Sequence, residues 1–341
     1  MDMVTNLLTE GVTEAIGDYL AGGVHVVCQS IDPPWRLSSH ARPHQDMAPG
    51  PEIALRTMAS VRALTAARDD AAFVDTFDDL ERALAEGRLS ILLHSQTSSQ
   101  FGSDLDLVSE TYAAGLRMSA LAYNVRSLAA DGCVESSNAG LSRWGRHVVS
   151  EMNRVGMIVD GSHVGERSTL EAMDRTETPF VFSHSGCRAL HEHPRNITDE
   201  QIRRCAATGG VVGIYAIPWF LCGSVQAPIE TMVEHVRHAV DVAGIDHVGL
   251  APDLFFGFGG YVDRAWPSIE GPDDGVGRLD DLLWGDDDLP ATSEPDRLAG
   301  FATAADWPTL TQALLDAGFD EREVRAISGE NWVRVMRACW R

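Results

Sequence analysis

Side chains that can bind a metal and move protons occur where short apolar segments of the sequence end. His163 and His184 close two consecutive segments, and Asp253 closes a later one. Imidazole and carboxylate groups are the ligands that zinc and similar divalent ions take in proteins. Such an ion would activate a water molecule or polarise a carbonyl group. A single histidine here is readily explained by ordinary hydrogen bonding, but two on neighbouring segments with an acid nearby favour a metal site. The other polar residues at segment ends are Asn6, Gln96, Tyr123, Asn124 and Asp160.

Eight segments with the composition of β-strands must position these residues. They span residues 1–6, 24–30, 89–96, 116–124, 157–163, 180–184, 211–217 and 247–253. Helical patterns lie between them, at residues 9–21, 103–114, 141–154, 198–208 and 229–243. Strands that alternate with helices predict an α/β fold, here a (β/α)8 TIM barrel. Functional residues of such barrels gather at the carboxyl ends of the strands, so we expect the polar residues above to share one end.

Two long stretches interrupt this alternation. Residues 32–51 are rich in proline and histidine, and residues 255–297 are rich in glycine, proline and aspartate. Loops of this length are commonly lids or binding elements, and here they would lie over the catalytic face. We therefore expect a single barrel domain over residues 1–341 that carries two long loops.

The charge of the chain restricts its partners. Lys and Arg number 27 against 50 Asp and Glu, which gives a net charge of −23. Phosphate backbones and anionic membrane surfaces would repel such a chain, so we expect neither nucleic acid nor membrane as a partner. The sequence has no apolar run of bilayer length and no basic secretory start, and its six cysteines lack CxxC spacing. These features predict a soluble cytoplasmic protein with free thiols.

Long motifs follow one another in order along the chain from residue 121 to residue 335. They read LAYNVRSLAADGC (121–133), GLSRWGRHVVSEMNRVGMIVDGSH (140–163), FSHSGCRALHEHPRNITDEQI (182–202), GGVVG (209–213), HVGLAPD (247–253) and ISGENWVRV (327–335). Together they resemble the membrane (renal) dipeptidase family of zinc metallopeptidases. The family fold is a (β/α)8 barrel of the metallo-dependent hydrolase type, in agreement with the independent count of strands.

The resemblance implies roles for several residues. In that family two zinc ions are held by a His-x-Asp pair on the first strand, a bridging glutamate after the third, and two histidines after the fifth and sixth. An aspartate after the eighth strand acts on the catalytic water. His163 and His184 match the two later histidines, and Asp253 matches the aspartate. Arg195, in the HPRN motif, matches the arginine that binds the substrate carboxylate, a task that suits its forked guanidinium group.

Other positions depart from the family pattern. The His-x-Asp pair falls on Val4 and Asn6, and the bridging glutamate falls on Gln96. A pocket histidine that steadies the tetrahedral intermediate falls on Tyr123. Valine cannot bind a metal, and neutral amides are poor zinc ligands beside carboxylates. We therefore expect a divergent branch of the family that has lost the metal site facing the first strand.

The retained residues favour a hydrolase with one metal ion. The substrate would be a small dipeptide-like or N-acyl amino acid amide with a free carboxylate. One divalent ion, expected to be zinc, would bind His163 and His184, with Asp253, Gln96 or water completing its coordination. Asp253 would act as general base and then as proton donor to the leaving amine.

The same reading assigns the substrate contacts and leaves alternatives open. Tyr123 would donate a hydrogen bond to the oxyanion, and Arg195, Tyr123 and Asn124 would bind the substrate. A lyase, isomerase or decarboxylase acting on an amino-acid-derived metabolite could use the same groups. A barrel without metal or catalysis is the third alternative. A homodimer is implied by the resemblance alone.

Overall fold

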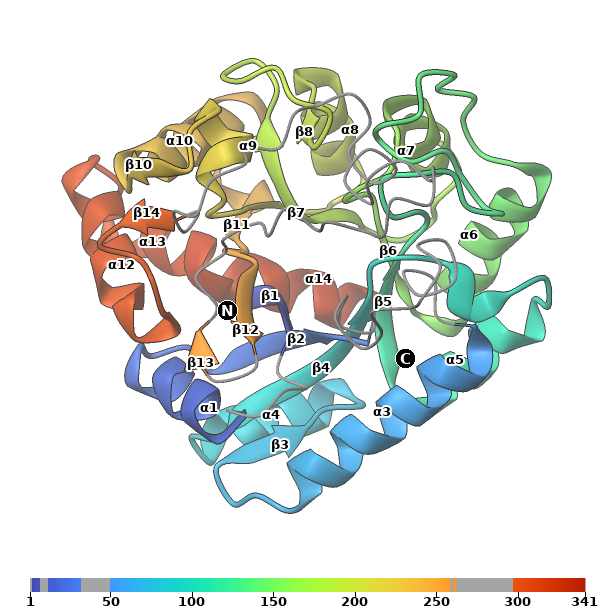
Figure 1. Cartoon of the computed structure of the whole chain (residues 1–341), viewed down its shortest axis with the longest axis horizontal. Coiled ribbons are helices and arrows are strands. Elements are labelled where there is room, and N and C mark those ends of the chain that lie inside the picture. The colour runs from blue at the N-terminus through green and yellow to red at the C-terminus, as the bar shows by residue number, and fades with distance from the viewer. Residues whose placement is uncertain (1, 7–11, 32–49, 258–259, 262–296, 341) are drawn as a thin grey trace, which may run out of the picture.

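Parallel strands curl into a barrel in the computed structural model, which describes residues 2–6, 12–31, 50–257, 260–261 and 297–340 (Figure 1). In sheet order, which is also chain order, the strands are β1 (Asp2–Asn6), β2 (Val26–Ser30), β4 (Leu89–Ser95), β5 (Leu116–Ala120), β6 (Ile158–Asp160), β7 (Phe180–Cys187), β9 (Val212–Ile214), β11 (Val248–Leu250) and β12 (Leu254–Gly257). The last two form one interrupted strand, because β11 pairs with β9 while β12 pairs with β1. The eight predicted strand positions and the (β/α)8 fold are confirmed.

Helices form an outer ring around this sheet (Figure 1). They are α1 (Val12–Ala21), α3 (Pro51–Ala66), α4 (Phe77–Ala85), α5 (Asp106–Ala114), α6 (Arg143–Val155), α7 (Glu166–Met173), α8 (Asp199–Ala207), α10 (Glu230–Ala243) and α12 (Trp307–Asp316). The five predicted helices correspond to α1, α5, α6, α8 and α10. None of the helices in the described part of the chain combines the length and hydropathy that crossing a membrane requires.

Local sequence signals set the helix ends. Thr198 accepts a hydrogen bond from the backbone N–H of Gln201, whose side chain in turn accepts one from Thr198, so the capping box expected at the start of α8 is present. Ser142 caps α6 through the N–H of Gly145. Gly115 ends α5 with φ of 118°, a conformation that favours glycine. These caps satisfy backbone groups that the helices leave unpaired.

Short elements complete the fold. The remaining strands are β3 (Ala71–Phe73), β8 (Asn196–Ile197), β10 (Gln226–Pro228), β13 (Gly260–Tyr261) and β14 (Arg297–Ala299). The remaining helical segments are η1 (Ser99–Phe101), α9 (Pro218–Cys222), η2 (Ile245–His247), η3 (Ala304–Asp306), α13 (Glu321–Arg325), η4 (Ala326–Glu330) and α14 (Asn331–Cys339). The predicted long loop at about residues 255–297 overlaps β12, which pairs antiparallel with β13, and it reaches β14 at Arg297. Residues 262–296, and residues 32–49 of the other predicted loop, lie outside the described part.

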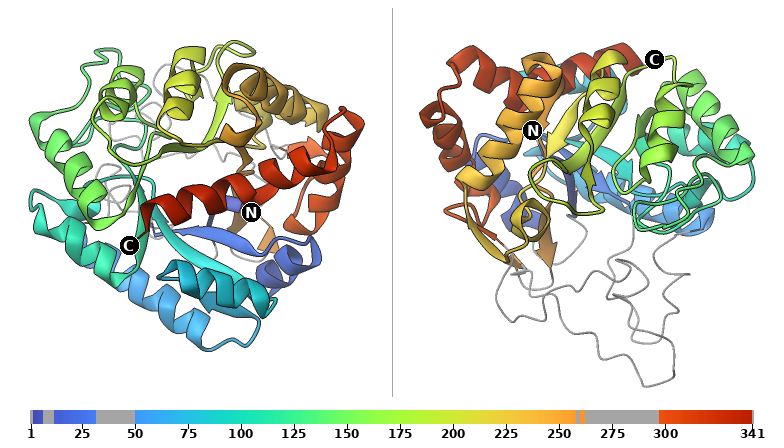
Figure 2. Two further views of the ribbon diagram at one scale, coloured as in Figure 1. Left: turned by 180° about the vertical axis from the view of Figure 1, so that it is seen from behind. Right: turned by 90° about the horizontal axis from the view of Figure 1, so that it is seen from above.

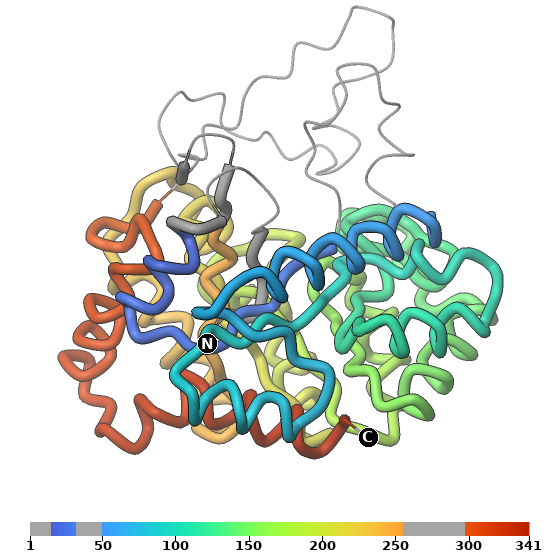
Figure 3. Tube along the Cα trace, turned by 90° about the horizontal axis from the view of Figure 1, so that it is seen from below, coloured from blue at the N-terminus to red at the C-terminus, as the bar shows by residue number. Residues whose placement is uncertain are grey.

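The last helix closes one end of the barrel. Seen from behind, α14 crosses the sheet, and seen from below it runs along the lower side of the molecule (Figures 2 and 3). Its buried side chains pack with residues near the starts of the strands. This cluster includes Val26, Leu92, Ile158, Val181, Val211, Trp332, Val335 and Met336. The amino ends of the strands are therefore filled with apolar side chains, which leaves the carboxyl ends for chemistry.

The strands end earlier than predicted on the functional side. Residues 121–124, 161–163 and 251–253 lie outside β5, β6 and β11. Asn124, His163 and Asp253 have φ of 55°, 67° and 61°, and Asn138 is the only other non-glycine residue with positive φ in the described part. The left-handed conformation is uncommon outside glycine, although Asn, Asp and His adopt it more often than other residues, and it turns the chain sharply after the strand. Three of the predicted site residues therefore lie at sharp turns at this end of the barrel.

Candidate metal centre and active site

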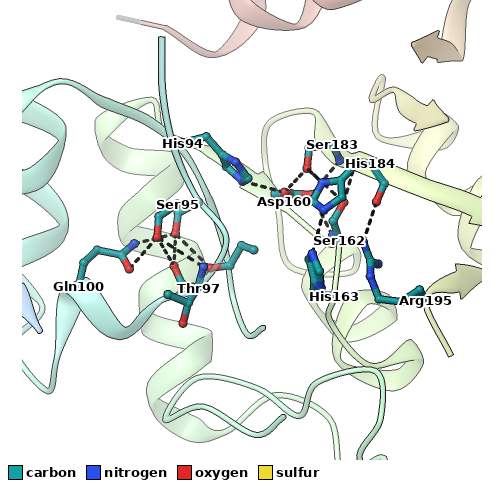
Figure 4. A network of polar contacts seen from close by, with 12 residues as sticks. His94, Ser95, Thr97, Gln100, Asp160, Ser162, His163, Ser183, His184 and Arg195 are labelled. Atoms are coloured by element: carbon teal, nitrogen blue, oxygen red, sulfur yellow. Dashed lines mark hydrogen bonds and ion pairs between the residues drawn. The ribbon is translucent and has the colours of Figure 1, made fainter. Parts of the chain in front are cut away.

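Two histidines from neighbouring strands face one another at the carboxyl end of the barrel (Figure 4). His163 follows β6, and His184 lies within β7. Their Nε2 atoms are 2.8 Å apart, and both side chains are buried. Tyr123 stacks on the His163 ring with centroids 4.0 Å apart. The structure thus brings together the two histidines that the sequence assigns to a metal.

Asn124 sets the protonation of His163. The Oδ1 atom of Asn124 lies 2.7 Å from His163 Nδ1. The thiol of Cys133 donates to the same oxygen at 3.4 Å. Since an amide oxygen only accepts hydrogen bonds, Nδ1 of His163 carries the proton, and the lone pair is on Nε2. Burial, followed by the positive charge of Arg195, lowers the pKa of His163 well below its usual value, so the neutral ring persists.

A second set of hydrogen bonds reaches His184 from the opposite side. His184 Nδ1 lies 2.8 Å from Oγ of Ser183, and that hydroxyl donates to Oδ2 of Asp160. The hydroxyl has a single proton, so it accepts from Nδ1–H of His184. His94 Nε2 donates to the same Asp160 oxygen at 3.1 Å. The lone pair of His184 is therefore also on Nε2.

Asp160 is held in its ionised form. Its Oδ1 accepts the backbone N–H groups of Ser162 and Ser183, each at 2.9 Å. Complete burial alone would raise the pKa of this carboxyl group. The hydrogen bond from His94, the adjacent His184 ring and the hydrogen bond from the Ser183 hydroxyl outweigh burial and hold the pKa well below its usual range. The Ser183 hydroxyl therefore connects His184 to a buried carboxylate.

Two lone pairs that face each other at 2.8 Å repel unless a proton or a metal cation lies between them. Zinc binds imidazole nitrogen at about 2.0–2.1 Å, so two nitrogens on one tetrahedral ion are about 3.3 Å apart. The observed separation is about half an ångström shorter, so the two rings would move slightly apart to share an ion. The His163 and His184 pair is therefore a candidate pair of ligands for one divalent ion.

Arg195 lies directly beside the pair. One of its terminal nitrogens donates to the backbone carbonyl of His184 at 3.2 Å. The side chain is 2% exposed, and its Nε has no hydrogen-bond partner among the described residues. The rings of Tyr215 and Phe220 lie 5.7 and 6.0 Å from the guanidinium carbon. A buried guanidinium group with an unused donor is suited to bind a carboxylate.

The strand pair β7–β8 positions this arginine. β8 lies parallel to the end of β7, with Gly186 opposite Asn196. A Cβ atom on Gly186 would lie 2.2 Å from the Asn196 side-chain oxygen, so this close approach requires glycine. Asn196 accepts from the Tyr215 hydroxyl and donates to the Phe220 carbonyl at 2.7 Å. The segment that carries Arg195 is therefore fixed against the barrel.

The other predicted site residues lie at ends of barrel strands. Gln96 follows β4, Asp253 follows β11, and both are buried. Val4 and Asn6 lie on β1, as the sequence predicts. No group of three or more His, Cys, Asp or Glu placed to hold an ion occurs within the described residues. The histidine pair, rather than a larger cluster, is therefore the candidate metal site among the described residues.

Sequence reasoning gave no role to His94, Ser162 or Ser183, and it noted Asp160 only as a polar strand end. His94 carried a usable signal, because it is a histidine within an otherwise apolar strand and stands two residues before Gln96. Side chains two apart on a strand share a face, so Gln96 in the pocket predicts that His94 also points into the barrel. Nothing in the sequence around Ser162 and Ser183 indicated a role for their hydroxyl groups.

Comparison with known proteins identifies the family. A model of the membrane dipeptidase family, peptidase family M19, matches residues 20–263. The chain belongs to the membrane dipeptidase family. Dipeptidase tcpJ of Claviceps purpurea is 30% identical over 263 residues, which are 76% of this chain and 53% of that protein. An uncharacterised dipeptidase of Schizosaccharomyces pombe is 36% identical over 253 residues, 73% of this chain and 53% of its own. The chain thus spans about half the length of these curated relatives.

Solved structures share the whole fold with this membrane dipeptidase family member. An amidohydrolase from Pseudomonas aeruginosa has 27% sequence identity and a TM-score of 0.83, over 99% of this chain and 95% of that one. A metallopeptidase from Rhodobacter sphaeroides, liganded with a phosphinate mimic of the dipeptide L-Ala-D-Ala, has 20% identity and a TM-score of 0.75, over 99% of each chain. The family resemblance read from the motifs is confirmed.

Proposed function

We propose that this protein is a metal-dependent hydrolase of a small amide with a free carboxylate, dipeptide-like or an N-acyl amino acid, and that it uses one divalent ion, zinc. The facing Nε2 lone pairs of His163 and His184 are the observation that carries this proposal. Membership in the membrane dipeptidase family supports dipeptide-like substrates. The buried guanidinium group of Arg195 beside the pair supports a substrate with a carboxylate.

His163 and His184 would hold the ion, and Gln96 or Asp253 would add an oxygen ligand. When bound, zinc supplies a Lewis acid that polarises the scissile carbonyl and lowers the pKa of a water molecule. Asn124 keeps His163 in the ligating tautomer. The two histidine rings are neutral in the arrangement of hydrogen bonds derived above, which is the form that binds metals.

The remaining residues would bind the substrate and move protons. Arg195 would bind the free carboxylate through its forked donors. Asp253 would take a proton from the attacking water while the water oxygen bonds to the carbonyl carbon. The Tyr123 hydroxyl would donate a hydrogen bond to the negative charge that develops on the carbonyl oxygen. The carbon–nitrogen bond then breaks, and Asp253 returns the proton to the leaving amine.

Metal content and hydrolysis test the proposal together. Zinc-loaded wild type is expected to hold one ion per chain and to hydrolyse members of a panel of dipeptides and N-acyl amino acids. The double variant His163→Ala/His184→Ala should lose both the ion and the activity. Asp253→Asn should lower kcat by about 10²–10⁴-fold, the usual contribution of a general base. Zinc is measured by elemental analysis of the dialysed proteins.

His147→Ala is the matched control, because His147 is an exposed histidine on α6 away from the site. It should retain the ion and the activity. Equal metal content in wild type and the double variant would refute the metal site. Bound zinc without hydrolysis of any panel member would refute the hydrolase and favour a lyase, isomerase or decarboxylase reaction.

A further inference from the structure

A continuous line of hydrogen bonds runs from the barrel interior to the candidate metal ligand His184. It begins at His94, passes through the carboxylate of Asp160, and continues through the hydroxyl of Ser183 (Figure 4). All four side chains are fully buried. The Arg195 side chain contacts only the His184 carbonyl among the described hydrogen-bond partners, whereas the hydrogen bonds of this line connect the first three side chains to one another and to His184. Their arrangement instead determines which ring nitrogen of His184 carries a proton.

We propose that Asp160 is a positioning residue that acts through the Ser183 hydroxyl to hold His184 in the tautomer with its proton on Nδ1. This inference rests on the proposed metal site. Metal-bound histidines commonly donate their second N–H to a carboxylate or a carbonyl, which fixes the ring and raises its basicity. In this protein the Ser183 hydroxyl lies between His184 and the carboxylate, so Asp160 acts on His184 indirectly.

We call the four side chains His94, Asp160, Ser183 and His184 the relay. Backbone N–H groups fix the direction in which its hydrogen bonds are donated. Oδ1 of Asp160 accepts two backbone N–H groups, from Ser162 and Ser183, which cannot reverse. Oδ2 is therefore the atom that is left to receive the Ser183 hydroxyl proton. Ser162 supports the geometry separately, since its hydroxyl accepts the backbone N–H of His184 at 2.9 Å. Oγ of Ser162 also lies within reach of the Ser183 hydroxyl, at 3.2 Å. The charged Asp160 oxygen lies closer and is the stronger acceptor for the Ser183 proton, which leaves the hydroxyl to accept from His184.

Asp160→Asn should reverse the direction of the hydrogen bonds in the relay, because asparagine has the shape of aspartate but carries an NH2 donor. The asparagine oxygen must replace Oδ1, because the two backbone N–H groups require an acceptor there. Its NH2 group then occupies the Oδ2 position and donates to Ser183 Oγ and to His94 Nε2. His94 can accept this proton, because its Nδ1 has no partner among the described residues and is free to carry its own. The Ser183 hydroxyl turns to donate to His184 Nδ1, which moves the His184 proton to Nε2, the ligating atom.

Two measurements test the inference. Zinc affinity, from competition with a chromophoric chelator, is expected to fall about 10–100-fold in Asp160→Asn, the usual effect of losing such a partner. The protonation of His184 Nδ1 is read from long-range ¹H–¹⁵N correlations of the metal-free protein, and Nδ1 should carry a proton in wild type but not in the variant. A purely structural role for Asp160 would not produce that loss of the Nδ1 proton.

A pair of serine variants supplies the matched control. Ser183→Ala removes the relay without reversing it, so zinc affinity should fall by less than in Asp160→Asn. Ser185→Ala makes the same change two residues along β7, where the hydroxyl is buried and has no hydrogen-bond partner among described residues. Its zinc affinity should stay within twofold of wild type.

The outcomes separate this inference from the proposed function. An unchanged His184 tautomer in Asp160→Asn, with wild-type zinc affinity, would overturn the relay while leaving the metal site standing. Failure of wild type to bind zinc would overturn the proposed function, and the tautomer measurement on the metal-free proteins would still decide whether the relay operates. Equal losses of affinity in Ser183→Ala and Ser185→Ala would also overturn the relay.

Discussion

At the scale of single residues, hydrogen-bond direction decides what the site can bind. Asn124 and Asp160 stand on opposite sides of the two histidines, and each fixes one ring so that its Nε2 lone pair faces inward. Neither residue needs to touch an ion to do this. Arg195 adds a fixed positive charge next to the pair, which also helps to lower the pKa of His163. The two Nε2 lone pairs therefore lie next to a buried guanidinium group that is suited to bind a carboxylate.

Arg195→Lys tests the role of the guanidinium group. Lysine keeps the charge but loses the fork, so kcat/KM for substrates with a free carboxylate should fall about 10–100-fold, equivalent to about 1.5–3 kcal/mol for a charge-assisted hydrogen bond. The loss should appear mainly in KM. Substrates whose carboxylate is capped as an amide should be affected much less. Steady-state kinetics on matched free and amidated substrates provide the comparison.

Arg146→Lys, an exposed substitution on α6, is the control for this experiment and should leave both substrates unaffected. A loss in Arg195→Lys that is equal for free and amidated substrates would contradict carboxylate binding. It would mean that the arginine acts only by packing against Tyr215 and Phe220.

At the scale of secondary-structure elements, His235 joins three pieces of the fold. It lies on α10, its Nδ1 accepts the Cys187 N–H of β7 at 2.9 Å, and its Nε2 donates to the Leu221 carbonyl of α9 at 3.0 Å. Burial lowers the pKa of His235 to about 4. Protonation of Nδ1 would break the contact with β7, the strand that carries His184. The packing of α10 on this strand therefore depends on a neutral histidine.

His235→Gln should remove part of the pH dependence of stability. The pKa in the folded state is below the unfolded value of about 6.5, so the unfolded chain takes up the proton first and stability falls as the pH drops from about 6.5 toward 4. Between pH 7 and pH 5 this amounts to about 2 kcal/mol. Glutamine can accept from Cys187 and donate to Leu221 but does not titrate. Urea unfolding of both proteins at the two pH values measures the difference, and parallel pH profiles would contradict it.

The secondary-structure elements also show how much of the fold and of the candidate site the sequence alone could predict. Apolar runs and glycine stops predicted the eight strand positions, because each barrel strand is a short buried segment bounded by a turn. The motifs placed His163, His184 and Arg195 correctly at one end of the barrel. The strand ends were misplaced because residue type alone does not distinguish a left-handed backbone at His163 or Asp253 from an extended one. The His94–Asp160 contact joins residues 66 apart in sequence, and only the barrel brings them together.

At the scale of the whole molecule, the residues that pack the barrel interior and the residues of the candidate site lie at opposite ends of the strands. α14 and an apolar cluster fill the amino end, while polar residues, three of them at sharp turns, occupy the carboxyl end. The candidate metal ligands belong to adjacent strands, β6 and β7, so a bound ion would connect two neighbouring units of the barrel. An ion that binds only the folded protein stabilises it by mass action.

Zinc should therefore raise the melting temperature of the protein. At a free zinc concentration of about 100 times Kd the stabilisation is about 2.7 kcal/mol. Unfolding entropy is about 2.1 cal/mol/K per residue, so for a chain of 341 residues this corresponds to a rise of roughly 4 °C. Calorimetry with zinc and with a chelator measures the shift. The double variant His163→Ala/His184→Ala should melt at one temperature under both conditions, because it lacks the facing lone pairs. A zinc-dependent rise of equal size in that variant would place the stabilising ion elsewhere on the molecule and contradict the proposed centre.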